Sequence, residues 1–129
     1  MIQRAKYGTF DLLMKINYHL QVLFFQSETG HEPVREWLKN LSAKERKVLG
    51  EDIKTVQFGW PLGMPLIRKL EKDLWEIRTK SDHKIYRIIF TVYESCIVLL
   101  HGFIKKSQKT PPRDLELAQK RLSQLKSGG

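Results

Sequence analysis

Residues 74–104, LWEIRTKSDHKIYRIIFTVYESCIVLLHGFI, decide the fold of this chain. The stretch is rich in β-branched and aromatic residues, and polar interruptions at 81–84 and 94–95 divide it into three segments. A shorter segment at 66–70 has a similar character, so three or four strands follow one another. The predicted strands are 66–70, 74–80, 84–93 and 96–104, joined into an antiparallel sheet.

The sequence on either side of this sheet predicts helices and one more strand. Pro33 suits the first turn of a helix, and Ser42 with Glu45 matches a capping box that begins a second helix. Thr110 is a good N-cap and is followed by prolines, which predicts a last helix. Residues 15–26 have the composition of a strand. The apolar positions at helical spacing are Val34, Trp37, Leu38 and Leu41, then Leu49, Ile53 and Val56, then Leu115, Ala118, Leu122 and Leu125.

A chain of 129 residues with this pattern is expected to form one domain. We predict an α+β fold with an N-terminal strand, an antiparallel helix pair, an antiparallel sheet of three or four strands and a C-terminal helix. Residues 1–13 show no clear pattern. Either they are an extension that precedes a natural start at Met14, or they are an ordinary flexible terminus. The folded domain is expected to be 14–129.

The chain's formal charge of +9 is concentrated in one segment. Between Arg78 and Arg113 stand eight Lys or Arg residues and two acids, so this segment holds +6 of the total. A one-sided positive field of this kind is what a phosphate polymer requires of its partner. The charge therefore predicts a nucleic acid, a ribosomal surface or an acidic protein as the partner.

Several other classes of function find no support in the sequence. His19, His31, His83 and His101 lack the spacing of metal ligands, and no glycine-rich phosphate loop is present, so we predict neither metal nor cofactor. No apolar run approaches the ~20 residues that a membrane span requires. The single Cys96 lies in an apolar run, and no segment resembles a signal peptide. Together these features predict a reducing, cytoplasmic location.

Strand alternation divides the residues of the sheet between two faces. With a turn of two or four residues between the first two long strands, Glu76 and Arg78 share a face with Arg87. The four-residue turn places Arg78 directly opposite Arg87. A two-residue turn at 94–95 then places Gly102 opposite Arg87 on the next strand. The other face is expected to be core, formed by Trp75, Ile77, Tyr86, Ile88, Phe90, Leu99 and Phe103.

Two interpretations of the Arg78 and Arg87 pair remain open. Like charges opposite each other destabilise a sheet unless an anion or a carboxylate lies between them. Glu76 can supply that carboxylate, as part of a small ion network on a solvated sheet face. Alternatively, the two arginines bind a phosphate, and Gly102 leaves room for it.

Four segments carry a resemblance to a known protein family. They are LWEIR at 74–78, IYRIIF at 85–90, LLHGFIKKSQKTP at 99–111 and the helix 114–125. In these segments the chain resembles the RelE/HigB superfamily of bacterial and phage toxins, and more closely its phage-derived HigB-like branch. The first strand and the helix pair agree in order, so the resemblance covers about residues 15–126 and implies a RelE/ParE-like fold.

The resemblance implies the toxin of a type II toxin-antitoxin system, an endoribonuclease that cleaves mRNA in the ribosomal A site. In that chemistry the ribose 2′-OH attacks the adjacent phosphate without a metal, and fixed positive groups stabilise the transition state. The implied partners are the ribosome, mRNA and a helix-turn-helix antitoxin of the HigA-like type. Operator DNA is contacted only through that antitoxin.

The resemblance also implies roles for individual residues. Arg87 best matches the family's phosphate-contacting arginine. Arg78, Lys105 and Lys106 stand where relatives hold basic functional residues. Glu76 and His101 are the candidates for proton transfer. Some relatives place a tyrosine near the C-terminus, whereas this chain has none after Tyr93. The candidate catalytic residues are Arg87, Arg78, Lys106, Lys105, Glu76 and His101, and the candidate RNA-binding residues are Lys80, Lys84, Lys109 and Arg113.

Two further functions fit the same fold, because a fold alone does not decide function. A ParE-like inhibitor of DNA gyrase needs a complementary surface and no proton-transfer groups. The clustering of Arg78, Arg87, Lys105 and Lys106 on adjoining strands is an argument against it. A basic nucleic-acid-binding protein or antitoxin-regulated adaptor without catalysis is the other alternative. Independently of the function, the run of Lys105, Lys106 and Lys109 can be either an extension of the cationic site or an ordinary solvated surface.

Overall fold

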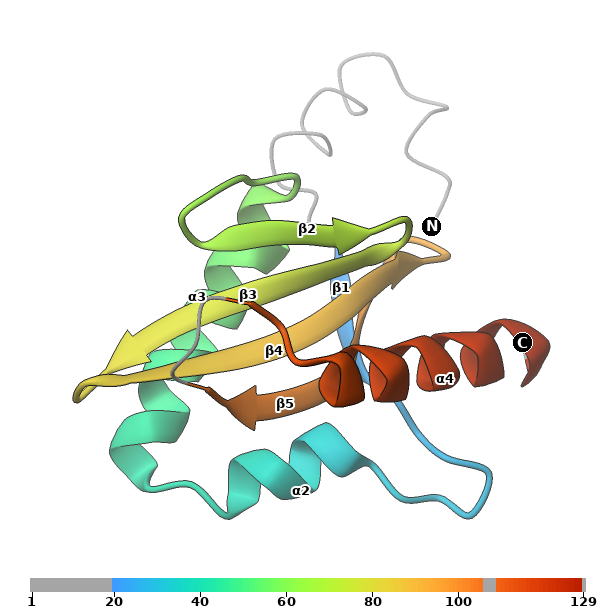
Figure 1. The fold of residues 1–129 in the computed structure, drawn as a ribbon, viewed down its shortest axis with the longest axis horizontal. Coiled ribbons are helices and arrows are strands. Elements are labelled where there is room, and N and C mark those ends of the chain that lie inside the picture. The colour runs from blue at the N-terminus through green and yellow to red at the C-terminus, as the bar shows by residue number, and fades with distance from the viewer. Residues whose placement is uncertain (1–19, 106–108, 129) are drawn as a thin grey trace, which may run out of the picture.

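The computed structural model describes residues 20–105 and 109–128 (Figure 1). Its elements follow one another as β1 (Gln21–Phe24), α2 (Pro33–Lys39), α3 (Ala43–Gly59), β2 (Ile67–Glu71), β3 (Leu74–Ser81), β4 (Lys84–Tyr93), β5 (Cys96–Ile104) and α4 (Pro112–Gly128). The five described strands form one sheet in the order β1-β5-β4-β3-β2. Strand β1 is parallel to β5, and the other neighbours are antiparallel. The predicted α+β fold is confirmed.

The first strand is shorter in its described part than the sequence predicted. The structure places a strand at Gln21–Phe24, and residues 25–26 already lie outside it. Residues 1–19 lie outside the described part of the chain, and so does the proposed start at Met14. The sequence did not indicate that this strand joins the main sheet by pairing with β5.

Helices α2 and α3 pack on one face of the sheet and form an apolar core with it. The capping box is present as predicted: the Glu45 backbone N–H donates to Ser42 Oγ at 3.1 Å, and the Ser42 backbone N–H donates to Glu45 Oε1 at 2.8 Å. Both predicted apolar stripes face this core. Its fully or nearly fully buried members are Val34, Leu49, Val56, Ile67, Ile77, Tyr86, Ile88, Phe90, Ile97 and Leu99.

The two long hairpins have two-residue turns whose central residues adopt positive φ angles. Asp82 and His83 have φ of 49° and 67°, and Glu94 and Ser95 have φ of 50° and 64°. Such turns match the right-handed twist of the flanking strands. The first turn pairs Ser81 with Lys84 and therefore Arg78 with Arg87. The predicted pairing of the two arginines is confirmed, although the turn has two residues, Asp82 and His83, and not the four from which the pairing was predicted.

A β-bulge in β5 changes which residues share a face. The pairing of β4 with β5 shifts by one residue at Leu100, which is the extra residue on β5. Beyond it, Arg87 pairs with Phe103 rather than with Gly102. The predicted positions of Gly102 beside Arg87 and of Phe103 in the helix-pair core are therefore wrong. The two-residue turn at 94–95 therefore predicts correctly which face each residue of β5 occupies only as far as the bulge at Leu100.

Gly102 serves the packing of α2 instead of leaving room for a phosphate. A Cβ atom on Gly102 would lie 2.4 Å from Cε3 of Trp37, so the indole occupies the space above the glycine. Helix α2 can approach β5 at this point only because the residue beneath Trp37 has no side chain.

Helix α4 covers the opposite face of the sheet, where it packs mainly on β5 and also on β4 (Figure 1). Its predicted stripe packs on a second core that contains Leu74, Ile89, Val98, Leu100 and Phe103. The interpretation of this face as solvated is therefore wrong. Thr110 is not the N-cap, because the helix begins at Pro112 and the Thr110 hydroxyl donates to a sheet residue.

A second bulge, in β2, also serves the docking of α4. Glu71 pairs with Leu74, and Lys69 pairs with Trp75, so Leu70 is the extra residue. Gln119 of α4 donates to both carboxylate oxygens of Glu71 at 3.0 Å. At the β5 bulge, Arg121 Nη1 of α4 donates to the carbonyl oxygen of Leu100 at 2.8 Å. Helix α4 is thus held at both bulges.

Candidate functional site

Two arginines face α4 from the centre of the sheet. Arg78 on β3 stands directly opposite Arg87 on β4. The side chain of Arg87 has no exposed surface, whereas Arg78 is half-buried. Because like charges in this arrangement repel each other, the pair requires a neighbouring anion.

Glu76 supplies part of the required negative charge. It lies two residues before Arg78 on the same face, is fully buried, and places Oε1 3.8 Å from Nη1 of Arg87. Its other oxygen, Oε2, accepts a hydrogen bond of 2.8 Å from the Thr110 hydroxyl. The segment that leads into α4 is therefore tied to the sheet beside the two arginines.

Arg68, on the edge strand β2, is a third arginine on the same face of the sheet. Arg68 on β2 is the cross-strand partner of Glu76. Its electrostatic effect on Arg87 is one of the influences that lower the pKa of Arg87. We call Arg68, Arg78 and Arg87, together with Glu76, the arginine cluster. The sequence prediction missed Arg68 because the Leu70 bulge decides its face.

The arginine cluster combines three positively charged side chains with one carboxylate. Cross-strand pairing places Arg78 opposite Arg87 and Arg68 opposite Glu76, and Glu76 Oε1 lies 3.8 Å from Nη1 of Arg87. Burial is the main cause that lowers the pKa of Arg87, the Glu76 charge opposes this effect, and Arg78 and Arg68 add to it. An arginine stays protonated despite such a shift. The buried Nε of Arg78 finds no hydrogen-bond partner among the described residues.

His101 lies on the same face but is engaged by α4. Its Nε2 is 2.7 Å from Oδ1 of Asp114, its Nδ1 is 3.4 Å from Nη1 of Arg121, and its ring stacks on Phe103 at 5.4 Å. Burial lowers the pKa of His101, against the effect of Asp114. A neutral ring that donates from Nε2 and accepts at Nδ1 satisfies both contacts. The sequence prediction missed Asp114 and Arg121.

The predicted basic residues are distributed over more than one surface. Lys105 continues the alternation of β5 on the side of Arg87, and its backbone N–H donates to Ile85. Lys84 lies on the α3 side, with Nζ 3.9 Å from Glu45. Lys106 lies outside the described residues. Three further candidates, all exposed at the surface, are Lys80, Lys109 and Arg113.

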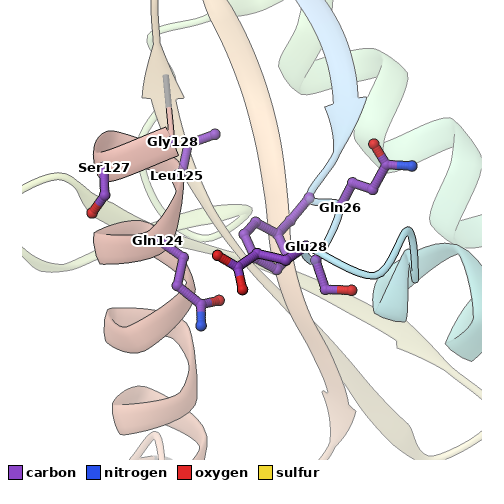
Figure 2. Close-up of a pocket in the computed structure, with 8 residues that line it drawn as sticks. Gln26, Glu28, Gln124, Leu125, Ser127 and Gly128 are labelled. Atoms are coloured by element: carbon purple, nitrogen blue, oxygen red, sulfur yellow. The ribbon is translucent and has the colours of Figure 1, made fainter.

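Two hollows that are lined by described residues lie away from the arginine cluster. A hollow of about 520 Å³ lies between the C-terminal turns of α4 and the chain that follows β1, as Figure 2 shows. Its lining includes the carboxylate of Glu28 and the amides of Gln26 and Gln124, but no Lys or Arg. A second hollow, of about 430 Å³, is lined by His101 and Arg113 at the other end of α4.

The chemistry available at the arginine cluster is the binding of an anion. Arginine forms fork-shaped hydrogen bonds that match phosphate oxygens, and it stabilises negative charge without exchanging its own proton. Within the described residues, no group of three or more His, Cys, Asp or Glu side chains is arranged to hold a metal ion. In the same part of the chain, no helix is long and apolar enough to cross a membrane.

Comparison with known proteins identifies the family. The family model described as phage-derived protein Gp49-like (DUF891) matches residues 36–123, about two thirds of the chain. This segment runs from α2 to most of α4 and includes the whole arginine cluster. No curated protein matches the chain significantly. The chain therefore belongs to the phage-derived Gp49-like family, a toxin-like family related to RelE and HigB.

Proposed function

We propose that this protein is the toxin of a type II toxin-antitoxin pair and acts as an endoribonuclease on mRNA at the ribosome. The observation that carries the proposal is the direct pairing of Arg78 with the buried Arg87 in a member of a toxin-like family. Arginines opposite each other on adjacent strands create a demand for an anion, and the buried Nε of Arg78 has no hydrogen-bond partner among the described residues. A backbone phosphate of RNA meets that demand.

In the proposed reaction the ribose 2′-oxygen attacks the adjacent phosphorus atom. The new P–O2′ bond forms as the P–O5′ bond breaks, which leaves a 2′,3′-cyclic phosphate and a 5′-hydroxyl end. A base takes the proton of the 2′-OH, and an acid gives a proton to the leaving 5′-oxygen. The arginines stabilise the negative charge that builds up on the phosphate oxygens in the transition state.

Glu76 and His101 remain the proposed groups for proton transfer, and their surroundings differ. The carboxylate of Glu76 lies within the arginine cluster, where a bound phosphate would be close to it. Both ring nitrogens of His101 contact side chains of α4. The geometry therefore favours Glu76 as the base, and it favours His101 as a residue that positions α4.

The proposed partner that restrains the toxin is a helix-turn-helix antitoxin. The charge of +9 favours an antitoxin that presents an acidic segment to the basic surface around residues 78–113. A structure of the complex in which that surface remains open would contradict this part of the proposal.

The test of the function is the substitution Arg78→Ala. Arg78 is half-buried, so this variant is expected to fold, whereas removal of the fully buried Arg87 endangers the fold. We expect loss of growth arrest on induction and loss of mRNA cleavage on translating ribosomes, both measured beside a Lys54→Ala control on the exposed side of α3. Full growth arrest by a normally expressed Arg78→Ala protein would refute the assignment. DNA damage without mRNA breaks on induction of the wild type would identify a gyrase inhibitor instead.

A further inference from the structure

We infer that Arg68 is a phosphate ligand of the arginine cluster, and that it forms the outer, RNA-facing layer of the site together with Arg78. This inference rests on the proposed function and deepens it. It assigns a role to a residue on the edge strand that neither the sequence pattern nor the family match singles out.

The first step of the argument is the position of Arg68 in the sheet. Cross-strand partners share a face, and Arg68 is paired with Glu76, which lies 3.8 Å from Arg87. The positive charge of Arg68 also contributes to lowering the pKa of Arg87, as expected for two groups on the same face. Arg68 therefore adds its charge to the same site as Arg78 and Arg87.

The second step is the gradient of burial across the arginine cluster. Arg87 and Glu76 have no exposed surface, whereas Arg68 and Arg78 are each half-buried. The inner pair lies under the segment that leads to α4, since Thr110 donates to Glu76. A phosphate that arrives from solvent thus meets Arg68 and Arg78 first, with Arg87 as a fixed charge beneath them.

The third step is the location of β2 at the edge of the sheet. Beyond β3, the described sheet ends at β2 (Figure 1). Arg68 on β2 therefore lies at the edge of the sheet, on the same face as Glu76. The buried Nε of Arg78 has no hydrogen-bond partner among the described residues and lies on that same face. A phosphate held between Arg68 and Arg78 would give that N–H an acceptor.

The experiment compares Arg68→Ala with Lys69→Ala. Lys69 is the next residue on β2, carries the same charge, and points to the opposite face, where its Nζ lies 5.8 Å from the ring centre of Trp75. Both variants lose one positive charge, so a difference between them reports the site and not the total charge. The probe is a short single-stranded RNA whose 2′-hydroxyls are O-methylated, so that binding is measured without cleavage.

We expect Arg68→Ala to bind this RNA at least about tenfold more weakly, the usual effect of losing a hydrogen bond to a charged group. The slope of log affinity against log salt should fall by about 0.7, as expected for one phosphate contact to a single strand. Lys69→Ala should keep both the affinity and the slope close to wild type. Arg68→Lys should recover part of the affinity, because it restores the charge without the planar fork.

The outcomes separate this inference from the proposed function. If Arg78→Ala loses binding and growth arrest while Arg68→Ala behaves like Lys69→Ala, the role of Arg68 is refuted and the proposed function stands. If Arg78→Ala also keeps both properties, the proposed function itself fails. A lower melting temperature of Arg68→Ala with an unchanged salt slope would assign Arg68 to structural pairing with Glu76 and would refute the inference as well.

Discussion

The two faces of the sheet are both buried, but they bury different kinds of residue. The face toward α2 and α3 is apolar, and its most demanding contact is the indole of Trp37 against Gly102. The face toward α4 combines an apolar core with Glu76 and Arg87, both fully enclosed. Enclosed charges oppose folding unless they are compensated. The burial of Glu76 and Arg87 on the second face is therefore not explained by stability alone.

This difference indicates that the two faces of the sheet have different roles. The helix pair and its core provide the rigid support, and the α4 face holds preorganised positive charge. Fixed charges act on a transition state without having to reorganise first, which is the property that a phosphate-cleaving site requires. Three substitutions test the comparison, in order of decreasing expected effect.

The largest effect is expected from Arg87→Met. This change leaves the carboxylate of Glu76 buried without its ion-pair partner, and breaking a buried pair in this way costs about 3–5 kcal/mol. The free energy of unfolding from urea titration at pH 7 measures the loss. The double variant Arg87→Met with Glu76→Gln should regain a large part of it, because neither member of the buried ion pair remains charged. A double variant as unstable as the single one would show that Arg87 stabilises this face by packing and not by charge.

A smaller loss, about 1–3 kcal/mol, is expected from Gly102→Ala on the other face. The new methyl group would lie 2.4 Å from the Trp37 ring, so α2 must shift away from β5. Urea titration gives the stability, and tryptophan fluorescence reports the displaced indole. Gly50→Ala is the matched control, because a Cβ atom at this exposed position in α3 meets no atom within 4 Å. Equal stability of Gly102→Ala and wild type would show that the helix-pair face tolerates added volume.

The smallest effect is expected from Tyr86→Phe in the core of the helix-pair face. The Tyr86 hydroxyl donates to Glu45 Oε2, and this hydrogen bond is the main cause that lowers the pKa of Glu45 to about 2. A lowered carboxyl pKa contributes stability above its ordinary value of 4.5, and that contribution is lost as the pH falls toward 2. Tyr86→Phe should therefore be less stable than wild type at pH 7, and the difference should shrink below pH 4.5.

The same contact predicts the behaviour of this variant at high pH. Burial, followed by the bond to Glu45, raises the pKa of Tyr86 to about 12. A raised pKa contributes stability below the ordinary value of 10, and this contribution is lost as the pH rises toward 12. A stability difference between wild type and Tyr86→Phe that stays constant from pH 3 to pH 11 would contradict the assigned contact.

Much of the fold could be predicted because its signals are local. The capping box, the apolar stripes and the two-residue turns each lie within a few residues, and the first turn alone places Arg78 opposite Arg87. The composition of the four main strands also indicated their bounds to within one residue.

The rest of the site could not be predicted because the two bulges are not local in origin. Leu70 and Leu100 are ordinary strand residues in sequence, and what distinguishes them is helix α4, which packs beside them but follows later in the chain. A regular ladder from the turn after Glu71 would pair Arg68 with Ile77, on the apolar face. A regular ladder in β5 would pair Arg87 with Gly102. Each bulge reverses the expected face, so alternation alone could not find Arg68 or place Gly102.

The parallel pairing of β1 with β5 has a consequence for the order in which the chain is made. The strand at Gln21–Phe24 leaves the ribosome early, whereas the strand with which it pairs, Cys96–Ile104, is among the last elements to be synthesised. Contacts that join such distant parts of a chain form slowly. The sheet, and with it the charged face, is therefore completed only near the end of translation, so a half-made chain carries no finished site.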